Sequence, residues 1–158
     1  MRETIVVDAA LLDAVTAEAG ASPRRRKNRN FHAADDAACH RLLNALEPGT
    51  YVRPHRHLDA SKDECMVILR GRAGIVLFDE SGAVVRRVVL DHRAGVLAVD
   101  IAAGTYHGLV ALEPGTVLLE AKAGPYLPTA GAEWGAFAPP EGDSGAAAYV
   151  AELERGFA

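Results

Sequence analysis

The 158-residue sequence has few cysteines, few aromatic residues and no long uninterrupted hydrophobic run. Its two cysteines, Cys39 and Cys65, match no thiolate metal motif, and we interpret both as small buried residues and not as a disulfide. The N-terminal stretch carries acidic residues among its apolar ones. It therefore lacks the apolar core of a secretory signal and the roughly 20-residue span of a membrane helix. We expect a cytoplasmic protein with no membrane partner.

A large charge of one sign is also lacking. The formal net charge is −4 at pH 7, which gives no general attraction to polyanions and argues against nucleic acid as a partner. One local exception stands out, because five of the six residues at 24–29 are Arg or Lys. This basic cluster lies in a polar segment, residues 21–34, which fits either a solvated loop or part of a binding site.

The length and the hydrophobic content of 49% allow one substantial core but not two comfortable domains. We expect a single domain over residues 1–158. It would comprise an N-terminal helix and basic arm (1–38), a β-barrel core (39–122), and a C-terminal wrap and helix (123–158). Helices are predicted near residues 9–19 and 144–155, where capping residues and turn residues flank helical patterns.

Short apolar runs separated by turn residues about every ten positions predict a mainly β barrel or sandwich between residues 39 and 122. Glu-Pro-Gly occurs at 47–49 and 113–115, and Asp-Glu-Ser-Gly at 79–82. The stretch 39–47 fits a helix or a strand, and we assign a strand. The other predicted strands are Thr50–Arg53, Glu64–Leu69, Ala73–Phe78, Val84–Leu90, Val96–Ile101, His107–Leu112 and Thr116–Lys122.

A metal site is predicted from His55, His57, Glu64 and His107. His55 and His57 follow a predicted strand, and side chains two apart on a strand point to the same side. Glu64 begins the next strand, and His107 begins a later one that can approach across a barrel. Three neutral imidazoles and one carboxylate suit a single divalent ion, which could be Zn, Fe, Mn, Ni, Co or Cu. A bare His-x-His pair is more often structural, so the surrounding sequence decides.

That context resembles the two sequence motifs of the cupin superfamily. The first is matched by Gly49, His55-Arg56-His57, Glu64 and Gly71, and the second by Gly95, Gly104 and His107. Ala102 stands where the family has proline, and Ala111 where it has asparagine. The gap between His57 and Glu64 is longer than usual, which leaves Asp59 and Asp63 as alternatives to Glu64.

A narrower resemblance, to the WbuC family of cupin-fold metalloproteins, covers most of the chain. It is carried by SPRRRKNRNFH at 22–32, ALEPGTYVRPHRH at 45–57, KDE at 62–64, ALEPG at 111–115, GPY at 124–126 and APPEGD at 138–143. The resemblance implies a jelly-roll, or double-stranded β-helix, barrel with one bound metal ion, and with the apolar strands it favours a homodimer. It also implies a role in bacterial O-antigen or related polysaccharide biosynthesis, without a known reaction.

Candidate ligand-binding residues are Arg26, Asn28, Asn30, Tyr51, Arg53, Lys62 and Tyr126. The first three alternate, so in an extended strand they share a face that suits a phosphate or sugar hydroxyls. Tyr51 and Arg53 have the same parity as the two histidines that follow them, whereas Lys62 and Tyr126 fall within the family-like motifs. His32 and His40 fit either a pocket or a structural role, and His92 is expected to be exposed in a turn.

Three functions of different classes remain open. The first is an enzyme acting on a nucleotide-linked or phosphorylated sugar, such as a metal-dependent isomerase or epimerase. The second is an Fe(II)-dependent oxygenase of a small molecule. The third is a non-catalytic sugar-binding or regulatory module, because one fold hosts many functions and no side chain is assigned as general acid or base. The ligand is expected to be a sugar or an anionic metabolite.

Overall fold

Strands with alternating inward and outward side chains dominate the computed structural model, which describes residues 4–158. Their bounds are β1 Arg26–Asn30, β2 Cys39–Leu46, β3 Glu64–Arg70, β4 Ala73–Phe78, β5 Val84–Leu90, β6 Ala98–Ile101, β7 Tyr106–Ala111 and β8 Thr116–Ala123. Within the described residues they form a five-stranded sheet, in the order β1-β2-β8-β3-β6, and a three-stranded sheet, β5-β4-β7. All pairs of neighbouring strands are antiparallel.

The main core lies between the two sheets, where apolar side chains from both inner faces meet. The five-stranded sheet contributes Leu46, Met66, Ile68 and Leu118, and the three-stranded sheet contributes Ala73, Ile75, Leu90, Leu109 and Ala111. Burial of this apolar surface holds the sheets face to face.

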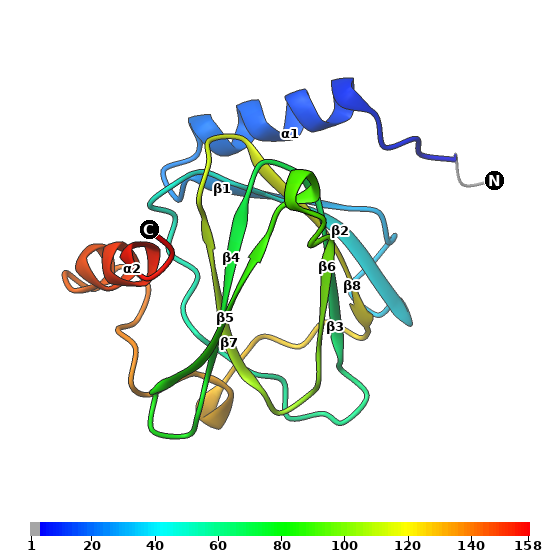
Figure 1. Cartoon of the computed structure of the whole chain (residues 1–158). Coiled ribbons are helices and arrows are strands. Elements are labelled where there is room, and N and C mark those ends of the chain that lie inside the picture. Colours follow the sequence, from blue (N-terminus) through cyan, green and yellow to red (C-terminus); the bar gives the residue numbers. More distant parts are fainter. Residues whose placement is uncertain (1–3) are drawn as a thin grey trace.

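Each sheet is covered on its outer face by one helix. Helix α1 (Ala9–Ala21) packs Val15 and Ala19 against Leu43, Ala45 and Val117 of the larger sheet. Helix α2 (Ala146–Arg155) packs Val150 and Leu153 on the outer side of the smaller sheet. Figure 1 shows α1 lying along β1 and α2 beside the smaller sheet. Two short 3-10 helices, η1 (His92–Ala94) and η2 (Gly131–Glu133), lie in the connections.

The mainly β fold with short terminal helices is confirmed, but residues 4–158 form two facing sheets and not one closed barrel. The predicted bounds of β4 and β5 agree with the structure. The expected strand Thr50–Arg53 is absent, because this stretch stays irregular up to an isolated bridge at His55. The basic segment contains an edge strand, β1, that no hydrophobic alternation signalled.

Both cysteines are free thiols, but the expectation that they are buried is wrong. Cys39 is exposed and Cys65 is half-buried. Cys39 begins β2 on the same outward parity as Leu43 and Ala45, which pack under α1 further along the strand. Cys39 is therefore exposed because it lies at the end of β2, beyond the part of the strand that α1 covers.

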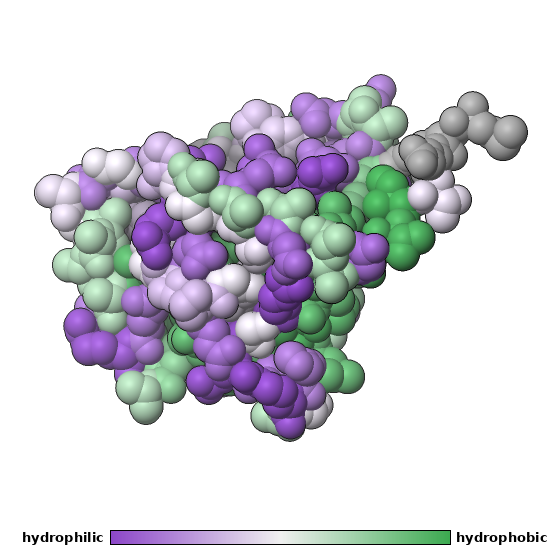
Figure 2. Space-filling view, turned by 90° about the horizontal axis from the view of Figure 1, so that it is seen from above, coloured by the Kyte–Doolittle hydropathy of each residue, from purple (hydrophilic) through white to green (hydrophobic). Residues whose placement is uncertain are grey.

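The described helices include none that is both long and apolar enough to cross a membrane. Seen from the α1 side, the surface is mostly hydrophilic, with a hydrophobic area at one side (Figure 2). Among the exposed apolar residues are Ile5, Val6 and Val7, which precede α1 and are 49, 71 and 40% exposed.

Candidate metal centre

The four predicted metal ligands come from three segments that the two sheets bring together. His55 pairs through its backbone with His107 of β7, each amide donating to the other residue's carbonyl at 2.9 Å. His57 lies two residues further on, and Glu64 is the first residue of β3 in the opposite sheet. The site therefore bridges the open ends of both sheets.

Their side chains converge on one buried point. Ligand atoms of His55, His57 and Glu64 all lie within 4.8 Å of one another. His107 joins this group, because its Nε2 is 3.0 Å from Oε2 of Glu64 and its ring centroid is 4.6 Å from that of His55. Glu64 and His107 are each only 2% exposed.

Hydrogen bonds to the backbone orient two of the imidazoles. Nδ1 of His55 contacts the carbonyl of Arg53 at 3.0 Å, and Nδ1 of His107 contacts the carbonyl of Thr105 at 2.9 Å. A carbonyl oxygen only accepts, so in each ring Nδ1 carries the proton and Nε2 presents a lone pair. This arrangement is typical of metal-binding histidines, in which the second nitrogen is held by a hydrogen bond.

The surroundings of the site favour a carboxylate at Glu64 and a neutral imidazole at His55. Burial raises the pKa of Glu64, but the contact with His57 and the ammonium of Lys122 outweigh it and hold the pKa below its ordinary range. Burial, with a smaller contribution from His107, lowers the pKa of His55 to about 3. A negative oxygen ligand and an unprotonated nitrogen ligand are the forms that bind a cation.

One contact in the site tests directly whether the residues fit a metal ion. Nε2 of His107 and Oε2 of Glu64 are fully buried and have no hydrogen-bond partner within the described chain, although they lie 3.0 Å apart. Both are electron-pair donors once Nδ1 holds the imidazole proton, so a cation between them would satisfy both. The four side chains therefore fit a divalent ion.

The predicted alternatives to Glu64 are directed elsewhere. Oδ1 of Asp59 accepts hydrogen bonds from Ser61 in its own turn. Oδ1 of Asp63 accepts the amide of Ala103 at 2.8 Å. Of the three acidic candidates, the structure brings only Glu64 to the histidines.

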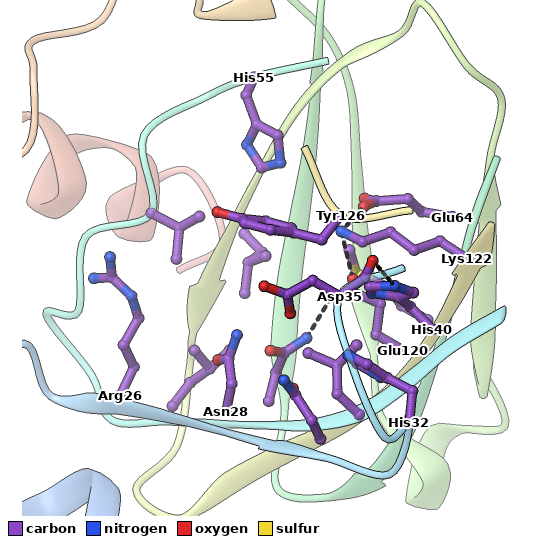
Figure 3. A pocket seen from close by; sticks show the side chains of 17 residues that line it. Arg26, Asn28, His32, Asp35, His40, His55, Glu64, Glu120, Lys122 and Tyr126 are labelled. Carbon is purple, nitrogen blue, oxygen red and sulfur yellow. Dashed lines mark hydrogen bonds and ion pairs between the residues drawn. The ribbon is translucent and has the colours of Figure 1, made fainter. Parts of the chain in front are cut away.

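A cavity of about 360 Å³ reaches the site from between the sheets. It is lined by Arg26, Asn28, Asn30, His32, Asp35, His40, Leu42, Asn44, Leu46, Val52, His55, Glu64, Met66, Leu109, Glu120, Lys122 and Tyr126. Arg26, Asn28 and Asn30 share the face of β1 that is turned toward this cavity. Two of the candidate metal ligands, His55 and Glu64, also belong to its lining. Figure 3 shows the ring of Tyr126 between His55 and the Asn28 side chain.

The other three candidate ligand-binding residues do not line this cavity. Tyr51 is buried against the smaller sheet and donates its hydroxyl to the carbonyl of Pro139 at 2.7 Å. Arg53 lies over the ring of Trp134, at 5.3 Å from its centroid. Lys62 is buried and donates to the carbonyl of Pro125 at 2.7 Å. Tyr51 and Arg53 would point to the same side as His55 and His57 only in a continuous strand, which is not formed.

Several polar residues that the sequence analysis did not select take part in the site. Nζ of Lys122 lies 2.6 Å from Oε1 of Glu64 and 2.7 Å from Oε1 of Glu120. Nδ2 of Asn44 donates to Oε2 of Glu120 at 2.5 Å. Leu118, Glu120 and Lys122 occupy every second position of β8 and point to the inner side of the sheet. Charged residues at the inward positions of an otherwise apolar strand are the sequence pattern that could have identified Glu120 and Lys122. His32 and His40, which were left open, stack at a centroid distance of 3.9 Å in the cavity wall.

Solved structures similar to this chain show the same fold at low sequence identity. SPY1581, a conserved protein of unknown function from Streptococcus pyogenes, matches with a TM-score of 0.55 and 17% identity over 80% of this chain and 93% of its own. TT1209 from Thermus thermophilus matches with a TM-score of 0.52 and 19% identity over 75% and 95%. These likenesses establish the fold alone.

A third structure is the capsular polysaccharide assembling protein CapF from Staphylococcus aureus. It matches with a TM-score of 0.52 and 19% identity over 64% of this chain, which corresponds to 27% of CapF. The fold is thus that of one part of a longer protein. A search of curated proteins found no match.

The sequence itself matches one family model. The match runs over residues 7–90, which is just over half of the chain and includes β1, the paired His55 and His57, and Glu64. His107 lies beyond it. The chain therefore belongs to the family described as a domain of unknown function, DUF6016.

Proposed function

We propose that this chain is a metal-binding protein of cupin fold that binds a nucleotide-linked or phosphorylated sugar in the synthesis of a bacterial polysaccharide such as O-antigen. The observation that carries the proposal is the continuity of the cavity with the metal ligands. One cavity contains both His55 and Glu64 of the candidate centre and the Arg26-Asn28-Asn30 face of β1. A ligand held by that face would therefore reach the ion.

Support for the polysaccharide context comes from the resemblance to the WbuC family along most of the chain. The name of CapF, capsular polysaccharide assembling protein, points in the same direction. Neither observation identifies a reaction, so the proposal concerns binding first.

His55, His57, Glu64 and His107 would hold the ion in this proposal. When bound, a divalent ion supplies Lewis acidity toward a ligand oxygen. The chain's own contribution is to orient the imidazoles through backbone carbonyls and to keep Glu64 anionic beside Lys122. Leu42 and Met66 of the larger sheet and Leu109 of the smaller one contribute apolar side chains to the cavity lining.

The geometry also favours a second candidate, a sugar-binding module without catalysis. Burial lowers the pKa of Lys122, but the carboxylates of Glu120 and Glu64 outweigh it and raise the pKa above the ordinary lysine value. An ammonium held in this way is a poor proton donor or acceptor at neutral pH. Lys122 is thus suited to stabilising negative charge beside the metal centre and not to transferring a proton.

The experiment begins with metal analysis of purified protein, followed by saturation-transfer NMR with a panel of nucleotide sugars and sugar phosphates. The expected result is stoichiometric metal and a sugar signal that disappears after treatment with EDTA. Product formation, followed in the same tubes by mass spectrometry, separates an enzyme from a binding module. Oxygen uptake by anaerobically Fe(II)-loaded protein would instead indicate the oxygenase. Protein without metal, or with metal but no binding of any sugar, would contradict the proposal.

A further inference from the structure

The cationic side chains of the cavity are already paired with carboxylates of the protein itself. Among residues 4–158, the basic side chains that line the cavity are Arg26 and Lys122. Nη2 of Arg26 lies 2.9 Å from both carboxylate oxygens of Glu141, and its Nη1 donates to the carbonyl of Tyr51 at 2.6 Å. Lys122 sits between Glu64 and Glu120. Neither cation is free for a phosphate.

Three carboxylates also line the same space. They belong to Asp35, Glu64 and Glu120, so the side chains of the lining carry more negative than positive charge. A phosphate bound at the Asn28–Asn30 face of β1 would approach Asp35 and Glu120 with no free side-chain cation beside it, because a metal ion would lie at the His55–Glu64 end of the cavity. Because like charges repel more strongly in a partly buried site than in water, this approach is unfavourable.

The polar groups that remain free are neutral amides. Asn28 of β1 stands directly opposite Asn44 of β2, and Asn30 is two residues further along the same face. No side-chain hydrogen bond of Asn28 or Asn30 occurs among residues 4–158, and both are exposed, so a ligand can reach them. Amides both donate and accept, which matches hydroxyl groups better than it matches phosphate.

Apolar groups complete the lining in a pattern that suits a sugar ring. Leu42 and Leu46 alternate with Asn44 on β2, and the Tyr126 ring lies across the cavity (Figure 3). An aromatic face beside amides can contact the C–H face of a ring while its hydroxyls are hydrogen-bonded. The cavity is thus amphipathic, with neutral polar groups on the β1 side.

From these contacts we propose that the group bound on the β1 side of the cavity is an uncharged, hydroxyl-rich ring, held by Asn28 and Asn30. This rests on the proposed function and narrows it: the glycosyl unit of a nucleotide-linked sugar enters, and charged phosphate groups stay outside. A phosphorylated monosaccharide is accordingly a poor ligand. The expectation that Arg26 binds an anionic sugar is replaced, because that guanidinium pairs with Glu141.

The test uses Zn²⁺-loaded full-length protein with confirmed metal content. Glucose, galactose and N-acetylglucosamine are each compared with their 6-phosphates by saturation-transfer NMR titration. At least one neutral sugar should bind ten or more times more tightly than its phosphate. Asn28→Ala and Asn30→Ala should each weaken that binding at least threefold without loss of metal. Lys27→Ala is the matched control, since Lys27 points to the other face of β1 and pairs with Glu18.

Two results would overturn the inference. Binding of a sugar phosphate equal to or tighter than that of its neutral parent would do so while leaving the proposed function intact. Undiminished binding in both asparagine variants would have the same meaning, and their circular-dichroism spectra check that they fold. If no neutral or phosphorylated sugar binds to metal-loaded protein, the inference and the sugar-binding part of the proposed function fail together.

Discussion

The two carboxylate oxygens of Glu64 have different surroundings, and this difference suggests how the residue would act. Oε1 receives Nζ of Lys122 at 2.6 Å and Nε2 of His57 at 2.9 Å. Oε2 faces Nε2 of His107 with no hydrogen bond. Oε2 is therefore the carboxylate oxygen that is free to bind a metal ion. Lys122 holds Oε1 and so fixes the rotation of the carboxylate. Glu64→Gln keeps the shape but removes the charge that attracts a dication.

Replacing His55, His57 or His107 by alanine should reduce affinity for Zn²⁺ by more than about tenfold in each case. Each change removes one of four donors, and even loss of an indirect partner of a metal ligand costs ten- to a hundredfold. The measurement is metal content after dialysis against a defined free Zn²⁺ concentration. His92→Ala is the control, because His92 lies in the exposed η1 turn. Full occupancy in all three variants would rule out this metal site.

The sequence predicts those residues of the site that are close together in the chain or stand at known motif positions. His55 and His57 are two residues apart, and Glu64 and His107 stand at motif positions. Asn44, Glu120 and Lys122 could not be placed in this way. Their contacts depend on the pairing of β2 with β8 and of β8 with β3, and the hydrogen bonds of Asn44 with Glu120 and of Lys122 with Glu64 join residues 76 and 58 positions apart. Tyr51 lies outside the cavity because the stretch before His55 is not a regular strand.

At the scale of elements, β1 is tied to the segment that precedes α2. The carboxylate of Glu141 accepts hydrogen bonds from Nε and Nη2 of Arg24, at 2.7 and 2.8 Å, and it also forms an ion pair with Arg26. The Arg24 guanidinium lowers the pKa of Glu141, burial opposes this, and Arg26 adds to the lowering. These contacts hold the basic segment on the opening of the cavity.

Glu141→Gln should therefore lower the free energy of unfolding at pH 7 by about 0.5–1 kcal/mol, a small value because the carboxylate is 43% exposed. A carboxyl with a depressed folded-state pKa stabilises the fold above its unfolded pKa and loses this effect as the pH falls through the folded-state value. The difference from wild type should thus shrink below the ordinary glutamate pKa of about 4.3. Urea titrations at several pH values measure it.

Glu152→Gln serves as the matched control, since Glu152 on α2 forms no ion pair within the described residues. A constant difference between Glu141→Gln and wild type at every pH would show that the charge of Glu141 is not what matters.

The predictability of the elements follows the strength of their local pattern. The hairpin of β4 and β5 combines apolar runs with an Asp-Glu-Ser-Gly turn, in which Gly82 has a φ of 87°, and its bounds agree with the structure. β1 carries Arg, Lys and Asn because one face looks into a polar cavity and the other places Lys27 and Arg29 beside Glu18 of α1, so no apolar alternation exists. Thr50–Arg53 has the composition of a strand but precedes Pro54, which lacks an amide donor.

The whole molecule leaves apolar side chains exposed at the edges of both sheets. Val85 on β5 is 63% exposed, and Val96 and Leu97, which lead into β6, are 41 and 53% exposed. Edge strands also present unpaired backbone groups that can pair with a second chain. We expect a homodimer of twice the 16.7 kDa chain mass at micromolar concentration. Light scattering that gives the mass of one chain would refute this expectation.

A bound ion should also stabilise the molecule as a whole, because its ligands belong to different sheets. Glu64 begins β3 of the five-stranded sheet, whereas His107 lies on β7 of the three-stranded sheet, and His55 is paired with β7. An ion that joins these side chains binds the folded arrangement and not the unfolded chain. At a free Zn²⁺ concentration a hundred times the dissociation constant, this linkage contributes about 2.7 kcal/mol.

For a chain of this length that free energy corresponds to a rise in Tm of about 5–10 °C. Thermal unfolding followed by circular dichroism, with Zn²⁺ and then with EDTA, measures the shift. His92→Ala should keep the full shift, while His107→Ala should lose most of it, since this change removes the ligand from the smaller sheet and leaves Glu64 of the larger sheet without its partner. An equal shift in both variants would mean that Zn²⁺ stabilises the protein at some other place than between the two sheets.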